Sequence, residues 1–221
     1  FQAVRRRFES CHPLHSLLDF TMQIFEEFID QSTANNIEEN ILSIPWYFQS
    51  STADYTSLGA GDGSFQRDLP YMKETLFFVN LVGCENHGTT AQDAKHFVPI
   101  IQRLEKVTGR PFMDRIIRIK ADLYVQCADY PADHYHQPHI DMWNEVTKKP
   151  DDAEIFLYYA DDSDGDTFFF KEEFGAEEYT TTYRSKPVKG KGVLFDNNIV
   201  HSSSPPVNHV RRMTVNFVFA K

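Results

Sequence analysis

The stretch YPADHYHQPHIDMW, from Tyr130 to Trp143, holds the residues of this chain best suited to binding a metal ion. Within it, His139 and Asp141 lie two positions apart, and residues i and i+2 of an extended segment project from the same face. An imidazole and a carboxylate can therefore reach one metal ion together. Two ligands do not complete a site, so a third must come from a distant segment that folds back.

The best candidate for the third ligand is His201, in the segment LFDNNIVHSSSPP. Two histidines and one carboxylate form the ligand set of non-haem Fe(II) sites and leave positions open for a cosubstrate, dioxygen or water. Taken singly, each residue has an ordinary explanation: a lone histidine near a strand end is usually hydrogen-bonded, and Asp141 suits a turn or a helix cap. The combination of the three favours a metal site.

Short strands in the second half of the chain would position these residues. Residues Ile116 to Val125 alternate between polar and apolar side chains, which predicts a strand whose polar face lines a pocket. Further aromatic or β-branched segments follow, separated by turn signals such as DDSDGD and KGKG. These segments are 153–160, 167–171, 179–184, 192–196 and 212–220. The pattern predicts about eight antiparallel strands in a double-stranded β-helix, or jelly roll, so the fold class is mainly β with flanking helices.

The first half of the chain carries helical patterns instead. Apolar residues recur at helical spacing from Pro13 to Asp30 and from Thr90 to Val107. Leu42 to Phe48 is typical of an edge strand or an extended cover, and Lys73 to Leu81 of a strand. The segment SSTADYTSLGAGDGSF between them is typical of a loop, with a mobile loop over a site as the functional alternative.

We therefore expect one domain spanning residues 1–221. Residues 1–114 would provide mostly helical support and lid elements, an N-terminal α-helical cover, and residues 115–221 the jelly-roll catalytic core.

The chain has a formal net charge of −10, which disfavours nucleic acid and anionic membranes as partners. Its only dense basic cluster, Arg5 to Arg7, is typical of a solvated N-terminal arm. Three widely spaced cysteines, Cys11, Cys84 and Cys127, without a CxxC pair, are expected to be reduced core residues. Because no apolar run of membrane-spanning or signal-peptide length occurs, we expect a cytoplasmic protein.

An arginine doublet, Arg211 and Arg212, opens the alternating segment RMTVNFVFA. A guanidinium at the start of a buried strand needs an anionic partner, which a dicarboxylate cosubstrate would supply. Adjacent residues of a strand point to opposite faces, so only one of the two arginines can enter the cavity. We choose Arg212, because Thr214 and Asn216 share its face while the other face is apolar.

The ordered segments RIKADLY, HIDMW, YYADDSDGDTFFF, GKGVLFDNNIVHSSSP and RRMTVNFVF resemble the superfamily of 2-oxoglutarate- and Fe(II)-dependent oxygenases. The likeness covers roughly residues 115–221 and is greatest to the prolyl-4-hydroxylase-like branch of bacteria and phages. This resemblance implies that His139, Asp141 and His201 are the iron ligands and form the catalytic centre.

The resemblance also implies a cosubstrate site. Arg212 and Thr214 fit the Arg-x-Ser/Thr pair that anchors the far carboxylate of 2-oxoglutarate, whereas Arg211 has the spacing from the distal histidine that many relatives show. Tyr124 resembles the tyrosine that binds the cosubstrate in such enzymes. Asp122 stands where relatives often carry asparagine, which leaves its role open.

The function implied by the resemblance is hydroxylation of a C–H bond in a proline-like peptidyl residue or a small molecule. The reaction would consume 2-oxoglutarate and dioxygen at Fe(II), with ascorbate as an optional reductant, and yield succinate and carbon dioxide as coproducts. The substrate and the oligomeric state stay open, since the segments Ser50 to Gln66 and Asp129 to Pro138 carry no decodable motif.

Two rival interpretations remain. A cupin-type metalloenzyme would use His134, His136 and His139 and would not require 2-oxoglutarate. A non-catalytic jelly-roll binding module would need no metal, and its histidines would be structural.

The acidic turn DDSDGD resembles a calcium loop, because Glu172 stands at the twelfth position counted from Asp161. We nevertheless expect Asp161, Asp162, Asp164 and Asp166, with Asp151 and Asp152, to form solvated turns, since TFFF should be a strand rather than an exiting helix.

Overall fold

The structure is a computed structural model, and it describes residues 22–49, 71–73, 75–84, 94–144 and 146–221. Most of its strands belong to one large sheet. These strands are β1 (Met22–Phe25), β2 (Tyr47–Gln49), β3 (Phe77–Cys84), β4 (Ile116–Val125), β7 (Ala153–Tyr159), β10 (Gly192–Asp196) and β12 (Arg211–Ala220). Their order across the sheet is β1-β10-β7-β12-β4-β3-β2, and every neighbouring pair is antiparallel.

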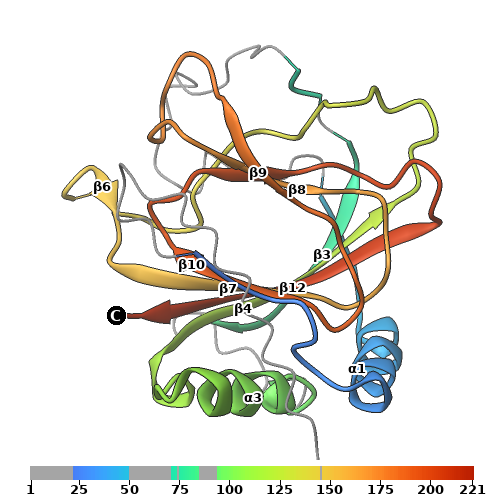
Figure 1. The fold of residues 1–221 in the computed structure, drawn as a ribbon, viewed down its shortest axis with the longest axis vertical. Coiled ribbons are helices and arrows are strands. Elements are labelled where there is room, and N and C mark those ends of the chain that lie inside the picture. The colour runs from blue at the N-terminus through green and yellow to red at the C-terminus, as the bar shows by residue number, and fades with distance from the viewer. Residues whose placement is uncertain (1–21, 50–70, 74, 85–93, 145) are drawn as a thin grey trace, which may run out of the picture.

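A smaller sheet faces the large one, as Figure 1 shows. It contains, in spatial order, β11 (His201–Ser203), β8 (Thr167–Phe170) and β9 (Thr181–Ser185), and a separate ribbon pairs β5 (Trp143–Asn144) with β6 (Lys149–Pro150). The strands expected from the second half of the sequence are therefore present. Together the two sheets form the predicted jelly roll, a mainly β fold with flanking helices.

Two helices lie against the outer side of the large sheet (Figure 1). Helix α1 (Gln31–Ser43) begins at Asp30, whose carboxylate accepts a hydrogen bond from the backbone N–H of Thr33 at 3.0 Å. Helix α3 (Val98–Thr108) ends at Gly109, which adopts a left-handed φ of 70°. A single 3₁₀ turn, η1 (Met113–Arg115), then leads into β4.

Alternation along the strands divides the core into two layers. On β7, Phe156 and Tyr158 pack toward the helices, while Ile155, Leu157 and Tyr159 pack between the sheets. The helix-side layer also includes Ile37, Ile41, Phe97, Ile100, Leu104, Phe112, Met213, Val215, Phe217 and Phe219. Because the apolar side of β12 is fixed in this layer, its polar side must face the interior between the sheets.

The predicted helix from Pro13 to Asp30 is wrong over its described part. Residues Met22–Phe25 form β1, which pairs with β10 at the edge of the large sheet, and residues 13–21 lie outside the described residues. Helix α1 was not predicted, and Asp30 caps this helix instead of ending an earlier one. The first half thus contributes β1, β2 and β3 to the large sheet besides its helices.

The other strands and the second helix expected in the first half are present, although some of their bounds differ. The edge strand expected over Leu42 to Phe48 is present as β2 at the end of the large sheet, but it begins only at Tyr47, because Leu42 and Ser43 still belong to α1. The second helical pattern is present as α3. The strand expected from Lys73 to Leu81 is present as β3 but begins later, at Phe77. The loop predicted after Phe48 lies outside the described residues.

Strand β4 has the predicted bounds but is not regular at its start. Its pairing with β12 skips Ile117, because Val218 lies opposite Arg118 and Phe219 opposite Ile116. This bulge turns Ile117 toward the layer between the sheets, contrary to the strict alternation expected from the sequence. Arg118, the residue after the bulge, also faces the interior between the two sheets, where it contacts Asp141.

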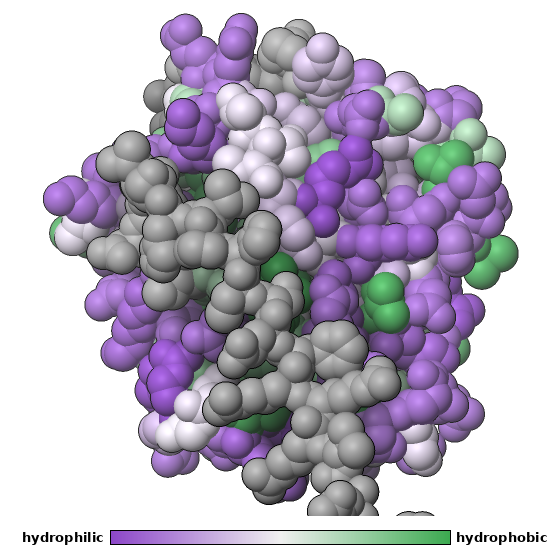
Figure 2. Space-filling view, in the orientation of Figure 1, coloured by the Kyte–Doolittle hydropathy of each residue, from purple (hydrophilic) through white to green (hydrophobic). Residues whose placement is uncertain are grey.

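Of the three cysteines, only the Cys127 side chain lies among the described residues. It is free as predicted, but it is half-buried rather than in the core. Within the described ranges, no helix is long and apolar enough to cross a membrane. Hydrophilic residues dominate the described part of the face in Figure 2, and hydrophobic ones form small separate groups there.

Candidate metal centre

The two proposed histidine ligands are direct cross-strand partners. His139 and His201 form an antiparallel bridge in which each backbone N–H donates to the other's carbonyl oxygen, at 2.9 and 3.0 Å. Their rings lie with centroids 4.6 Å apart. The fold therefore brings the two segments side by side, as the sequence analysis expected.

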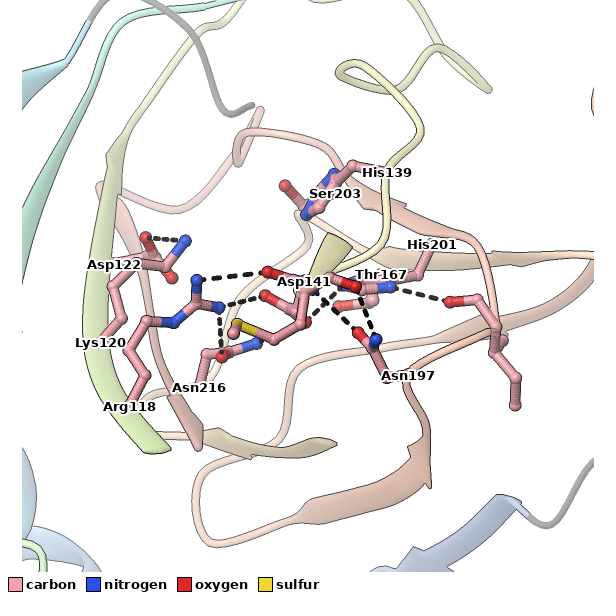
Figure 3. A network of polar contacts seen from close by, with 12 residues as sticks. Arg118, Lys120, Asp122, His139, Asp141, Thr167, Asn197, His201, Ser203 and Asn216 are labelled. Atoms are coloured by element: carbon pink, nitrogen blue, oxygen red, sulfur yellow. Dashed lines mark hydrogen bonds and ion pairs between the residues drawn. The ribbon is translucent and has the colours of Figure 1, made fainter. Parts of the chain in front are cut away.

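Asp141 reaches the same point from the turn that follows His139. Its Oδ2 lies 3.4 Å from His201 Nε2, and one ligand atom of each of the three residues lies within 4.8 Å of the others. Figure 3 shows Asp141 at the centre of this polar network. In the part of the chain that the structure describes, this is the one group of three or more metal-ligating side chains.

Backbone carbonyls fix the tautomer of both rings. His139 Nδ1 lies 2.9 Å from the Gln137 oxygen, and His201 Nδ1 lies 3.1 Å from the Ile199 oxygen. Because a carbonyl oxygen can only accept a hydrogen bond, Nδ1 carries a proton in each ring and Nε2 is the nitrogen that a metal could bind. Burial, reinforced by the neighbouring His201, lowers the pKa of His139 to about 3, so this ring is neutral.

The Asp141 carboxylate is held by two donors from the large sheet. Arg118 Nη2 donates to Oδ1 at 2.5 Å, and Asn216 Nδ2 donates to Oδ2 at 3.1 Å. Burial opposes the charged form, but the His201 contact and the Arg118 charge outweigh it and hold the pKa of Asp141 well below its usual range. The centre therefore presents an anionic oxygen and two imidazole nitrogens to a cation.

Asn197 locks the segment that carries these ligands. Its buried amide accepts from Met142 N at 2.9 Å and donates to the carbonyl oxygens of Met142 and Asp151 at 2.8 and 3.0 Å. The two bonds to Met142 fix the backbone directly after Asp141, and the third connects this point to Asp151. The carboxylate position is thus set from the β10–β11 connection as well as from the sheet.

Arg212 lies buried at another part of the same cavity. Its Nε donates to the Gly165 carbonyl oxygen at 2.7 Å, its Nη2 to Thr167 Oγ1 at 2.8 Å, and its guanidinium lies 5.1 Å from the centroid of the Tyr124 ring. No described carboxylate forms an ion pair with it, although its side chain is only 2% exposed. A buried guanidinium without a carboxylate partner makes Arg212 a candidate for binding an anion.

The two arginines of the doublet point in opposite directions, as predicted. Arg211 lies on the outer side, where its Nη2 contacts Glu38 at 2.7 Å and its Nε lies 3.4 Å from Asp161 Oδ2. Thr214 is buried on the cavity side with Arg212. Arg211 therefore already has carboxylate partners within the chain, whereas Arg212 has none among the described residues.

Tyr124 is held in a stack between two other rings. The centroid of the Phe77 ring lies 5.0 Å from that of Tyr124, with an interplanar angle of 9°. The centroid of the His136 ring lies 5.2 Å from that of Tyr124, with an interplanar angle of 16°. Ser203 Oγ bridges the Tyr124 hydroxyl, at 3.3 Å, and His136 Nδ1, at 3.1 Å. The Tyr124 ring is thereby fixed opposite Arg212, its register partner on β12.

His134 and His136 lie apart from the metal centre. His136 is buried, and its two ring nitrogens contact the hydroxyls of Ser203 and Thr75, at 3.1 and 2.7 Å. His134 Nδ1 lies 3.2 Å from the Ala132 oxygen, and its ring packs on Tyr71. Neither joins His139 in a ligand cluster among the described residues, so the geometry does not support the cupin-type ligand set.

One small cavity connects the metal centre with Arg212. Its lining comprises Lys120, Asp122, Tyr124, His139, Asp141, Leu157, Thr167, His201, Ser202, Ser203, Arg212, Thr214 and Asn216. Its volume of about 30 Å³ leaves room for roughly two water molecules. Binding of a dicarboxylate therefore requires lining side chains to move.

Three carboxylates of the acidic turn are not freely solvated, whereas Asp162 is exposed as predicted. Asp161 is buried and accepts from Met213 N at 2.8 Å, Asp164 accepts from the backbone of Val207 and Asn208, and Asp166 contacts Arg184 at 2.9 Å. TFFF is the expected strand, β8. These carboxylates anchor the loops beside β12, so the prediction of solvated turns was wrong for them.

Gly165, within this turn, gives a prediction. A Cβ there would lie 2.5 Å from Ser204 O and 2.9 Å from Arg212 Cδ, so Gly165→Ala must displace backbone or the guanidinium. We expect it to lower the free energy of unfolding by about 1–3 kcal/mol and to weaken binding of 2-oxoglutarate. Chemical denaturation and calorimetric titration measure the two effects.

Gly192→Ala is the matched control, because its Cβ would lie 2.4 Å from Phe156 Cζ, in the helix-side layer. It should destabilise the fold similarly but leave the affinity for 2-oxoglutarate unchanged. Equal losses of affinity in both variants would show that Gly165 acts only through stability.

Sequence reasoning gave no role to Arg118, Asn197 or Thr167. Arg118 stood on the predicted polar face of β4, Asn197 shortly before the distal histidine, and Thr167 at the start of TFFF. Asn197 is a polar residue close to a proposed ligand in the sequence, whereas Arg118 and Thr167 are marked only as polar residues in the first part of a strand. Their partners lie 23 or more positions away in the chain.

Fold and site together define a jelly-roll protein in which two histidines and one carboxylate lie close together beside a buried arginine. No protein-family model and no curated protein sequence matches the chain. Solved structures do match, and the fold is that of the 2OG-Fe(II) oxygenases.

One such structure is an oxidoreductase of the 2OG-Fe(II) oxygenase family from Burkholderia pseudomallei, 10% identical with a TM-score of 0.57, which covers 90% of this chain and 84% of its own. Another is a prolyl hydroxylase from Trichoplax adhaerens in complex with a hypoxia inducible factor peptide fragment, 12% identical with a TM-score of 0.53. The match covers 90% of this chain and 83% of the hydroxylase chain. A third is AviO1 from Streptomyces viridochromogenes Tue57, 12% identical with a TM-score of 0.51. The match covers 90% of this chain and 89% of the AviO1 chain. At such identities the likeness concerns the fold.

Proposed function

We propose that this protein is a 2-oxoglutarate- and Fe(II)-dependent dioxygenase that hydroxylates a C–H bond of a peptidyl residue or a small molecule. The observation that carries the proposal is the shared cavity. It joins three grouped ligand atoms to a buried arginine that has no carboxylate partner among the described residues. A metal-free binding module would gain nothing from this arrangement.

The donor set fits a ferrous ion. His139 and His201 can bind a metal through Nε2 because their Nδ1 protons are bonded to carbonyls, and Asp141 offers a deprotonated oxygen. Three ligands on one side leave positions for a bidentate cosubstrate and dioxygen. Such an ion supplies the activation of dioxygen, and the protein supplies binding and orientation.

The residues around Arg212 fit a dicarboxylate. The guanidinium fork can bind the far carboxylate in a bidentate manner, while its contacts with Gly165 and Thr167 keep the fork in place. Thr214 and Tyr124 present hydroxyls on the same cavity wall. Arg212 contacts Thr167 of β8, whereas His139 pairs with His201 of β11, and all four residues line one cavity. A single molecule that spans this cavity can therefore engage both Arg212 and the metal.

The proposed reaction converts 2-oxoglutarate, dioxygen and R–H into succinate, carbon dioxide and R–OH, with ascorbate as an optional reductant. A peptidyl substrate is supported by the Trichoplax neighbour, which is in complex with a peptide fragment. A small-molecule substrate is the alternative within the same chemistry.

The test is succinate release by the protein with Fe(II) and 2-oxoglutarate, using a panel of proline-containing peptides and free amino acids. We expect succinate formation that requires both additions and that a substrate stimulates. Metal-dependent turnover of a substrate without 2-oxoglutarate would favour the cupin-type alternative. Failure to bind either metal or 2-oxoglutarate would favour the binding module.

A further inference from the structure

A second cavity lies beside the ribbon of β5 and β6, apart from the metal centre. Its walls come from this ribbon, from the end of β8 with residues 171–174, and from residues 198–200, and we call it the ribbon pocket. Its volume of about 450 Å³ suits a small organic molecule, whereas the metal cavity has about 30 Å³. No described residue lines both cavities. The chemistry proposed above therefore makes no use of the ribbon pocket.

Apolar and aromatic side chains form the inner wall of the ribbon pocket. Trp143 and Phe174 lie with ring centroids 5.5 Å apart, and the buried residues Phe170, Ile199 and Val200 complete this wall. Aromatic rings pack favourably against other rings, either offset or edge to face. The wall can therefore receive the flat body of an aromatic molecule.

This wall belongs largely to the side of the small sheet that faces away from the metal ligands. On β8, Phe169 lies on the inner side, with its ring centroid 6.2 Å from that of His201. Phe168 and Phe170 pack with Val200 in a separate apolar cluster. A ligand that packs on Phe170 and Val200 would thus leave the metal cavity accessible.

Lysines dominate the charged rim of the ribbon pocket. Its charged residues are Lys148, Lys149, Lys171, Glu172 and Glu173. Glu172 already accepts a hydrogen bond from the backbone N–H of Thr180, at 2.6 Å. Among the described residues, neither Lys149 nor Lys171 has a carboxylate within ion-pair distance. In a chain of net charge −10, three lysines around one cavity favour an anionic ligand.

We propose that the ribbon pocket is a second ligand site, which binds a small aromatic anion. The rings of the ligand pack against Trp143 and Phe174, and its carboxylate or other acidic group meets Lys149 and Lys171. A neutral aromatic molecule would gain only the ring contacts, and an inorganic anion only the charge contacts. The pocket therefore selects molecules that carry both parts.

The first test uses benzoate, naphthalene-2-carboxylate and biphenyl-4-carboxylate as probes, each beside its carboxamide, which has the same shape without the charge. Calorimetric titration of the full chain gives the affinities. Trp143 is one of two tryptophans in the chain, so Trp46→Phe assigns its indole N–H resonance in NMR spectra. We expect at least one carboxylate to bind, to shift this resonance, and to bind at least about fivefold more tightly than its carboxamide. Binding of no carboxylate, or equal affinity of both forms, would overturn the inference.

A pair of double variants makes the test specific to the two lysines. Lys149→Gln with Lys171→Gln removes two charges at the pocket. Lys95→Gln with Lys106→Gln removes two exposed charges in or just before α3, which lies against the large sheet (Figure 1). The pocket variant should weaken carboxylate binding at least about fivefold and leave carboxamide binding unchanged, while the control keeps the affinity of the wild type. Equal losses in both variants would show only an effect of net charge, and the inference would fail.

The last test separates the ribbon pocket from the cosubstrate site. Zn(II) with excess 2-oxoglutarate should leave the affinity for the carboxylate probe within about twofold, a change of a few tenths of a kcal/mol, because no described residue lines both cavities. Competition between the two would place the probe in the metal cavity and refute the second site. A protein that binds the probe at Trp143 but binds no 2-oxoglutarate would refute the proposed function and support the second site.

Discussion

Asp141→Ala is expected to abolish stoichiometric binding of Fe(II) or a substitute divalent metal. It removes the only anionic ligand of the centre and leaves the two imidazoles, of which His139 is neutral because burial lowers its pKa to about 3. His201→Ala should have a similar effect, since one cross-strand partner is lost. Metal content after desalting, measured by plasma mass spectrometry, gives the result directly.

His134→Ala is the control for this experiment, because His134 lies nearby in sequence but contacts Ala132 and Tyr71 instead of the centre. It should keep full metal content. Asp141→Ala should also lower the free energy of unfolding of the metal-free protein by about 3 kcal/mol, because Arg118 loses its carboxylate partner. Full metal retention in both Asp141→Ala and His201→Ala would refute the proposed ligand set.

Arg212→Ala should weaken 2-oxoglutarate binding by about 2–5 kcal/mol, which is more than tenfold in affinity. The variant leaves the far carboxylate of the bound cosubstrate desolvated and without its cation. Titration of 2-oxoglutarate into the Zn(II)-loaded protein measures the loss. Arg212→Lys, which keeps the charge but not the bidentate fork, should fall between the wild type and Arg212→Ala and guards against a folding defect.

Arg211→Ala is the matched control, since it removes the neighbouring arginine from the outer face, where Glu38 and Asp161 are its partners. Its affinity for 2-oxoglutarate should stay within about twofold of the wild type, a change of a few tenths of a kcal/mol. The reverse ranking would make Arg211 the anchor. An unchanged affinity in both variants would remove the main support for 2-oxoglutarate as cosubstrate.

Local sequence patterns determined much of the jelly roll. Strict alternation of polar and apolar side chains fixes which face of β12 is buried among the helices, and it therefore placed Arg212 and Thr214 inside and Arg211 outside. The same reasoning placed His139 and Asp141 together. A period of two follows from strand geometry alone, so it can be read without knowledge of the partners.

Tertiary structure determined the conformation of segments whose local sequence pattern was weak or ambiguous. Met22–Phe25 fits a helical spacing, but its backbone completes the hydrogen bonding of β10, and a few residues are too short for periodicity to separate the two states. Helix α1 buries only Ala34, Ile37 and Ile41, so its apolar stripe was too narrow to stand out in a polar segment. The bulge at Ile117 likewise depends on pairing with β12.

The sequence by itself determined the kinds of ligand atom and the strand faces that carry them. Only the tertiary structure decided the surroundings that make these atoms usable: Arg118 and Asn216 on Asp141, Asn197 on the following backbone, and the carbonyls that fix the two histidine tautomers. The same holds for the Arg212 contacts with Gly165 and Thr167. The physical reason is that long-range hydrogen bonds depend on donor and acceptor positions set by sheet packing, and a one-dimensional pattern does not encode these positions.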